Sequence, residues 1–189
     1  MKLSRGAKTI VYPTPVFVVG TYDEAGKANA MTVAWGGICC SRPPCVAISV
    51  RKATYTYSNL MLRKAFTVNI PARQHARQAD YFGIISGRDV DKFAETGLTA
   101  VQSDPVDAPY IQEFPLNLLC EVLAIHEIGL HTLFVGEIKD VLADEDVYDT
   151  EGKLDVKKVD PILWAPDDGG YYSVGDFVGQ AFHIGRDKE

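Results

Sequence analysis

Residues 49–56 combine groups that proteins use to bind phosphate. Ser49, Arg51, Thr54 and Thr56 place hydroxyls and a cation where a strand ends and a helix is expected to begin. The first N–H groups of a helix have no acceptor within the helix and mark its positive end, which favours an anion. An ordinary Ser/Thr helix cap beside a solvated Arg–Lys pair explains the same residues, and this stretch alone does not decide between the two.

A second glycine-containing turn follows at residues 86–93. It carries further cations and leads into a short expected helix. On its own this pattern assigns no ligand.

The segment 29–37 could support a flat ligand. It offers the amide of Asn29, the hydroxyl of Thr32 and the indole of Trp35, and it ends in two glycines. Glycine lets a ligand lie close to the backbone. An isoalloxazine ring needs such a surface, with polar groups for one edge and apolar cover for the other. A strand with a buried core tryptophan accounts for the same residues.

Several common catalytic and metal-binding patterns are not present in the sequence. It contains neither GxxxxGK[ST] nor GxGxxG, the glycine loops that hold phosphates on parallel sheets. His126 and His131 are five residues apart, too far around a helix for one zinc ion. The stretch 83–87 misses the GxSxG nucleophile elbow by one residue. We therefore predict no catalytic side chain and no metal site.

Short apolar runs separated by turn residues predict strands, and two runs with helical spacing predict helices. The strands are expected at 15–22, 28–35, 45–50, 66–70, 115–126 and 133–142, and the helices at 54–64 and 72–82. The first two and the last two strands should form β-hairpins, because turn residues join them. The expected fold class is mainly β, an antiparallel barrel with a few inserted helices, rather than a doubly wound sheet.

The length of 189 residues predicts a single domain, residues 1–189. The acidic, turn-rich tract 144–168 is expected to be a surface excursion. The glycine- and aromatic-rich end, residues 171–189, is expected to be a tail that docks on the protein.

Charge and apolar patterning limit the partners. The chain has 19 Lys and Arg residues and 25 Asp and Glu residues, a net charge of −6, so it lacks the basic excess that nucleic-acid binding requires. Its apolar runs fall far short of the roughly 20 residues of a membrane span. We predict neither nucleic acid nor membrane as a partner.

The four cysteines, Cys39, Cys40, Cys45 and Cys120, include no CxxC pair. This pattern disfavours thiol–disulfide chemistry and predicts reduced thiols in the cytoplasm. The adjacent Cys39 and Cys40 are expected to be small residues in or near the core.

Taken together, these segments resemble the flavin reductase-like family of FMN-binding split β-barrels, and within it flavoredoxins most. The resemblance runs from about residue 8 to residue 186. Its motifs occur in the family's order and are NAMTVAWGG (29–37), the RPP turn (42–44), SVRKATYTY (49–57), FTVNIP (66–71), SGRDVDKF (86–93) and GLHTLFVGEI (129–138).

The resemblance implies a homodimer with one non-covalently bound FMN in each subunit, near the subunit interface. It also implies a set of cofactor-binding residues. The residues along the ring and ribityl chain would be Asn29, Met31, Thr32 and Trp35. The residues at the phosphate would be Ser49, Arg51, Thr54 and Thr56. Ser86 and Lys92 would approach the phosphate from the 86–93 turn. His131 would reach the flavin from the opposite side, in its own or the partner subunit, and Trp164 stands where family members often carry an aromatic residue.

The function that the resemblance implies is electron transfer through bound FMN, as an FMN-dependent oxidoreductase or an electron carrier of the flavoredoxin type. Two alternatives are an NAD(P)H:flavin oxidoreductase with free flavin as substrate and a non-catalytic flavin-binding module. The electron donor would be NAD(P)H or a redox protein. The sequence does not distinguish NADH from NADPH, and it gives no reduction potential and no acceptor.

Overall fold

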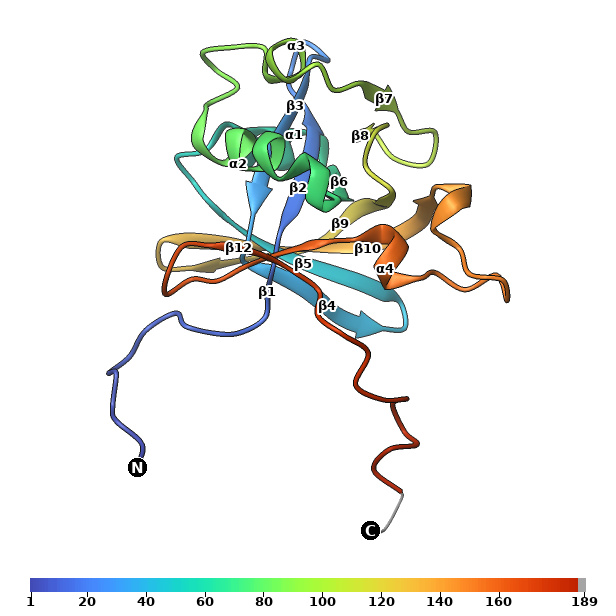
Figure 1. Cartoon of the computed structure of the whole chain (residues 1–189). Helices are drawn as coiled ribbons and strands as arrows, with labels where there is room; N and C mark the ends of the chain where they lie inside the picture. Colours follow the sequence, from blue (N-terminus) through green and yellow to red (C-terminus); the bar gives the residue numbers. More distant parts are fainter. Residues whose placement is uncertain (187–189) are drawn as a thin grey trace.

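The computed structural model describes residues 1–186, and within them antiparallel strands form the body of the molecule (Figure 1). The largest sheet has the strand order β3-β2-β6-β9-β10-β5-β4, and every neighbouring pair in it is antiparallel. Its strands are β2 (Phe17–Tyr22), β3 (Ala28–Val33), β4 (Gly36–Ser41), β5 (Pro44–Arg51), β6 (Ala65–Ile70), β9 (Leu116–Ile128) and β10 (His131–Ala143).

Two small sheets lie beside the large one. The first has the order β1-β11-β12, with β1 (Thr14–Pro15), β11 (Ile162–Trp164) and β12 (Tyr171–Ser173). The second pairs β7 (Ala100–Gln102) with β8 (Pro109–Ile111). The first small sheet brings Trp164 opposite Thr14, and so ties the C-terminal part of the chain to its beginning.

The helices are short. They are α1 (Tyr55–Arg63), α2 (Ala76–Ile84), which follows the 3-10 turn η1 (Arg73–His75), and α3 (Lys92–Thr96); farther along the chain come η2 (Glu145–Val147) and α4 (Val156–Val159). Of these, α1, α2 and α3 gather on one side of the strands, next to β2 and β3, whereas α4 lies apart from them (Figure 1). Thr54 caps α1 by accepting a hydrogen bond from the Tyr57 backbone, and Lys64 ends the helix with a φ of 56°. Such a hydroxyl cap and left-handed end are the usual limits of a helix.

Two apolar clusters hold these layers together. Phe66 and Phe134 are fully buried with Leu60 of α1 between the strands of the large sheet. Phe82 of α2 and Phe93 of α3 pack in the other cluster, against β2 and β3. The second cluster therefore fixes α2 over the strand that carries Asn29, Met31 and Thr32.

The predicted hairpins and both predicted helices are confirmed, with small shifts in their ends. Within the large sheet one strand was not predicted: β4 begins at Gly36-Gly37, and the RPP turn joins it to β5. Its residues from Ile38 to Ser41 are all exposed, so they show none of the apolar alternation that marks a half-buried strand. Cys39 and Cys40 lie there on the surface, so the expectation that they belong to the core is wrong.

The tract 144–168 is mostly exposed, but it also contributes to the interior. Val147, Val159 and Ile162 are buried, which anchors η2, α4 and β11. After β12 the chain runs away from the body to residue 186 (Figure 1). Residues 187–189 of the predicted docking tail lie outside the described residues.

Within residues 1–186, no helix has the length and apolar character needed to cross a membrane. The location of the protein in the cytoplasm stays a prediction from its cysteines.

Candidate functional site

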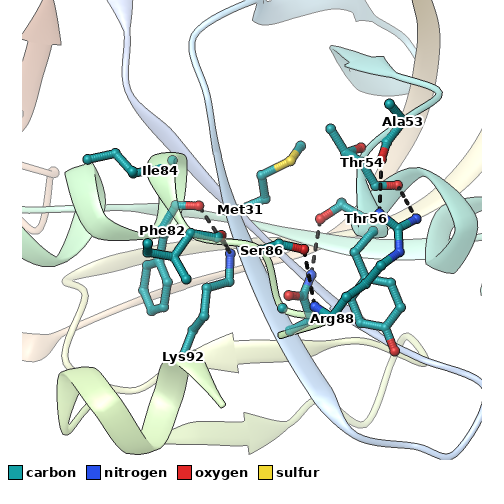
Figure 2. A pocket seen from close by; sticks show the side chains of 14 residues that line it. Met31, Ala53, Thr54, Thr56, Phe82, Ile84, Ser86, Arg88 and Lys92 are labelled. Atoms are coloured by element: carbon teal, nitrogen blue, oxygen red, sulfur yellow. Dashed lines mark hydrogen bonds between the residues drawn. The ribbon is translucent and has the colours of Figure 1, made fainter. Parts of the chain in front are cut away.

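A cavity of about 220 Å³ lies between the beginning of α1 and the loop that leaves α2 (Figure 2). Met31 of β3 forms part of its wall, and Ile84 and Ser86 face it from the loop. Thr54 and Thr56 bring the first turn of α1 to the same space. Three segments that are distant in the sequence therefore meet around one helix N-terminus.

The chain turns tightly before α1. Both the backbone N–H and the hydroxyl of Thr54 donate to the carbonyl oxygen of Arg51, at 3.0 and 2.8 Å. The turn leaves the first backbone N–H groups of α1 without an acceptor inside the helix, at its positive end. Such a helix end favours an anion.

Arg88 supplies the positive charge at this end of the cavity. Its Nη1 donates to the carbonyl oxygen of Ala53 at 2.9 Å, and its guanidinium carbon lies 5.3 Å from the centre of the Tyr55 ring. The Tyr55 hydroxyl in turn donates to Oδ2 of Asp23 at 2.7 Å, and this hydrogen bond, together with burial, raises the pKa of Tyr55. The guanidinium is thus held beside the helix N-terminus by contacts that leave part of its N–H fork available.

Asn29 lies between the helix and the loop. Its Nδ2 donates to Oγ1 of Thr56 at 3.0 Å, while its Oδ1 is buried and has no hydrogen-bond partner among residues 1–186. A methyl group at Gly87 would stand 2.0 Å from this oxygen, so only glycine lets the loop approach it. A buried acceptor without a partner is costly, which makes this oxygen a candidate contact for a ligand's donor.

Lys92 lines the cavity on the side of the loop that follows α2. Its side chain is buried, and its Nζ donates to the carbonyl oxygens of Phe82 and Ile85, at 3.1 and 3.0 Å (Figure 2). Burial lowers the pKa of Lys92 to about 8, because no carboxylate offsets the loss of water. An ammonium group has three donors, so one remains for a ligand.

A second hollow of about 250 Å³ adjoins the cavity, and Gly83 and Ile84 line both. Thr32 and Trp164 stand on its walls. The indole of Trp164 meets that of Trp35 edge to face, with ring centres 5.8 Å apart. One hollow offers hydroxyls and cations, and the other offers aromatic surface, so together they suit a ligand with an anionic tail and a flat head.

The structure brings most of the predicted cofactor residues together. Those that line the cavity are Asn29, Met31, Thr54, Thr56, Ser86 and Lys92. Thr32 and Trp164 line the adjoining hollow, where the hydroxyl of Thr32 donates to the carbonyl oxygen of Ala79, and Trp35 stands behind Trp164.

Three predicted residues lie apart from this group. Ser49 and Arg51 are on β5 and His131 is on β10, where Arg51 and His131 are direct cross-strand neighbours. None of the three lines either hollow. Arg51 instead contributes its backbone carbonyl to the turn before α1. A contact of these side chains with a flavin stays a prediction.

Sequence reasoning missed Arg88 and Tyr55. Arg88 stands inside the glycine-containing turn at 86–93, whose cations were noted, but its hydrogen bond to Ala53 spans 35 positions. The glycine next to Arg88 in that turn was the available signal for its role. The spacing along the chain does not show with which earlier element the arginine side chain forms its hydrogen bond.

An antiparallel barrel with an anion site at a helix N-terminus and an aromatic hollow next to it defines a flavin-binding protein of the split-barrel class. The family model described as "Flavin reductase like domain" matches residues 9–174. The chain therefore belongs to the flavin reductase-like family of flavin-binding redox proteins, and the predicted split-barrel fold is confirmed.

Solved flavoredoxin structures resemble this chain closely. Flavoredoxin of Desulfovibrio vulgaris (Miyazaki F) is 50% identical, with a TM-score of 0.95 over 98% of this chain and 100% of its own. Flavoredoxin from Methanosarcina acetivorans is 33% identical, with a TM-score of 0.91 over 98% of both chains. A high molecular weight rubredoxin of Moorella thermoacetica is 29% identical over 102 residues, which are 53% of this chain and 43% of that protein.

Proposed function

We propose that this protein binds FMN and transfers electrons through it, as an electron carrier of the flavoredoxin type. The observation that supports this most is the pair of adjoining hollows, with the helix N-terminus and Arg88 at one end and Trp164 at the other. FMN ends in a phosphate dianion, which distinguishes it from riboflavin. A cation and helix N–H groups at the end of the cavity suit that phosphate.

In this proposal each residue has a separate task. Thr54, Thr56 and Arg88 hold the phosphate, and Asn29 orients the ligand through its unpaired oxygen. When bound, FMN supplies the redox chemistry, accepting and releasing one or two electrons. The Lys92 ammonium beside the cavity stabilises negative charge on a reduced ligand and so favours its reduction.

Two relatives support a redox protein as the electron partner. The similarity to flavoredoxins covers almost the whole chain. The matching relative from Moorella thermoacetica is named a rubredoxin and is more than twice as long as the matched region. The acidic surface of this chain, with a net charge of −6, would speed encounter with a basic partner. The second candidate function is an NAD(P)H-dependent reductase, which the family's description as flavin reductases favours.

A visible spectrum and an anaerobic mixing experiment test these proposals. We expect purified protein to show flavin absorbance and to release FMN on denaturation. Under anaerobic conditions, bleaching by a reduced rubredoxin and not by NADH or NADPH supports the carrier. Prompt bleaching by NADH or NADPH supports the reductase instead. A colourless protein that stays colourless with added FMN would overturn both.

Arg88→Met tests the assignment of the phosphate end. We expect it to weaken FMN binding by roughly tenfold or more, since a charge-assisted hydrogen bond contributes about 1.5–3 kcal/mol. The affinity for riboflavin, which lacks the phosphate, should decrease little. Fluorescence titration with both ligands measures this. Arg51→Met examines the predicted role of that side chain, and Arg73→Met, whose partner is Asp160, is the matched control. Equal losses for FMN and riboflavin would contradict the phosphate assignment.

We further propose that the chain forms a homodimer, as the family resemblance implies. Large apolar side chains stand exposed at the 129–130 turn and in the C-terminal segment, among them Leu130, Phe177 and Phe182. A second copy that covers them would remove this surface from water. Sedimentation equilibrium of the flavin-loaded protein tests the dimer.

A further inference from the structure

Three of the four cysteines gather at the hairpin of β4 and β5, away from the flavin site. Cys40 of β4 stands directly opposite Cys45 of β5, next to the pair Ser41 and Pro44 that closes the hairpin. Neither Cys40 nor Cys45 lines the cavity or the adjoining hollow. The electron-transfer function proposed above makes no use of these thiols, so they require a separate explanation.

The separation of Cys40 and Cys45 suits a disulfide. Opposite residues in an antiparallel pair have Cα atoms about 4.5–5.5 Å apart. A disulfide needs Cα atoms about 4.4–6.8 Å apart, and the usual spacing of directly opposite residues falls within this range. Oxidation would thus join two strands that the hairpin already holds side by side.

The two thiols differ in their access to solvent. Cys40 is exposed, and its Sγ donates a hydrogen bond to the carbonyl oxygen of Arg42 at 3.3 Å. Cys45 is only 1% exposed. Burial raises the pKa of Cys45, and the neighbouring thiols and Glu137, its cross-strand partner on β10, raise it further. This difference in access assigns Cys40 as the thiol that attacks a disulfide reagent. It assigns Cys45 as the resolving thiol, which attacks the mixed disulfide formed on Cys40.

Cys39 has no such partner in the ladder. The pairing of β4 with β5 shifts register between Ile38 and Cys40, and Cys39 falls in this irregularity. It is exposed like Cys40 and adjacent to it. Cys39 therefore provides an internal comparison, a thiol of equal access without a residue opposite.

We propose that Cys40 and Cys45 form a reversible dithiol–disulfide pair that exchanges with small disulfides such as oxidised glutathione. The Cys40 thiolate attacks one sulfur of the reagent, whose S–S bond breaks, and one thiolate leaves. The Cys45 thiolate then attacks Sγ of the mixed disulfide on Cys40 and releases the second. Two protein thiols are oxidised, the reagent is reduced to two thiols, and the two protein protons pass to them.

Mass spectrometry of the whole flavin-loaded protein, incubated with oxidised glutathione, tests this proposal. Trypsin does not cleave before proline, so Cys39, Cys40 and Cys45 remain in one peptide, residues 28–51. We expect this peptide to lose two hydrogens and to regain them with dithiothreitol. Cys39→Ser should lose the same two hydrogens as the wild type. Cys40→Ser should lose no hydrogens, and Cys45→Ser should keep a glutathionyl group on Cys40 in addition to the one on the exposed Cys39.

Other results would overturn the proposal. One is a wild-type peptide whose mass does not change. Another is the loss of two hydrogens in Cys40→Ser or in Cys45→Ser. A third is a loss of two hydrogens in the wild type that does not occur in Cys39→Ser. A dimer linked through Cys39 would also contradict it. The flavin spectrum and far-ultraviolet circular dichroism of each variant establish that it is folded, so that a missing disulfide reports on the thiols.

Discussion

Asn29 and Thr56 show how the site depends on side chains that meet from separate elements. They are 27 positions apart, on β3 and α1, and a 3.0 Å hydrogen bond joins them in the buried floor of the cavity. The bond uses only the amide nitrogen of Asn29. The same bond fixes the direction of the remaining oxygen, which is the atom that the proposed function assigns to the ligand.

Lys92 makes the stability of the chain depend on pH in the alkaline range. Its pKa in the folded chain is about 8, against an ordinary 10.5. Between these values the unfolded chain binds more protons than the folded one, so the contribution of Lys92 to the free energy of unfolding rises with pH from about 8 to 10.5. We expect Lys92→Met to lack this rise, as measured by urea unfolding of the flavin-free chain at several pH values.

The comparison needs a lysine that is not buried. Lys64 ends α1 at the surface, and Lys64→Met should keep the pH dependence of the wild type. If Lys92→Met and the wild type show the same slope above pH 8, the assignment of a depressed pKa to Lys92 is wrong.

At this scale the sequence predicts residue types better than their partners. Thr54 and Thr56 were identifiable because they stand at a helix start, a feature within a few residues of them. Arg88 was not, because its partners are Ala53 and the ring of Tyr55, which only tertiary packing brings to it. The same holds for Cys40 and Cys45, whose pairing depends on a strand that the sequence pattern does not reveal.

The loop between α2 and α3 is the element that completes the cavity. The carbonyl oxygens of Phe82 and Ile85 accept from Lys92, Gly87 packs against Asn29, and Arg88 donates to Ala53. The loop therefore has a buried ammonium beneath it and almost no space between its backbone and β3. Contacts with the core side of the molecule therefore hold the loop in place.

Gly87→Ala should displace this loop. The added methyl group would stand 2.0 Å from Oδ1 of Asn29 and 3.2 Å from Cδ1 of Tyr55. We expect a loss of about 1–3 kcal/mol in unfolding free energy, as for other overpacked sites, and weaker retention of flavin. Thermal unfolding and fluorescence titration measure the two effects. Gly37→Ala is the matched control, because its methyl group would have no neighbour within 4 Å. If both variants have the same unfolding free energy and the same flavin affinity, the loop accommodates the methyl group and the assignment of close packing is wrong.

Elements with a regular apolar pattern were predictable and the others were not. Strand β10 alternates buried and partly buried residues along its first half. Strand β2 is a continuous buried run, with Val18 and Val19 in different apolar clusters. The two- and three-residue strands β1, β7, β8, β11 and β12 are too short to show any period. Their pairing is set by the larger sheet and helices on which they rest.

At the scale of the whole molecule, the C-terminal segment stands out. Phe177, Val178 and Phe182 are 78%, 92% and 87% exposed, so they contribute almost nothing to the core of their own chain. Lys157 holds the beginning of this segment by donating to the carbonyl oxygens of Val174 and Gly175. Beyond this contact the chain leaves the body of the molecule (Figure 1).

Removal of the segment tests its role in the proposed homodimer. A chain that ends at Gly175 should keep its circular dichroism and shift from dimer toward monomer in sedimentation equilibrium, since the deleted apolar side chains would otherwise cover the partner. The control is full-length Lys153→Met, which removes only a surface ion pair with Glu151. A truncated chain that stays fully dimeric would place the subunit contact elsewhere.

The unpaired oxygen of Asn29 also links this protein to the vitamin supply of its cell. A group left unsatisfied inside the fold weakens the empty chain, and a ligand that satisfies it adds its binding free energy to stability. Empty chains open more often, and opened chains are the ones that proteases cut. The proposed FMN binding therefore implies that a cell short of riboflavin holds fewer copies of this protein, even with its synthesis unchanged.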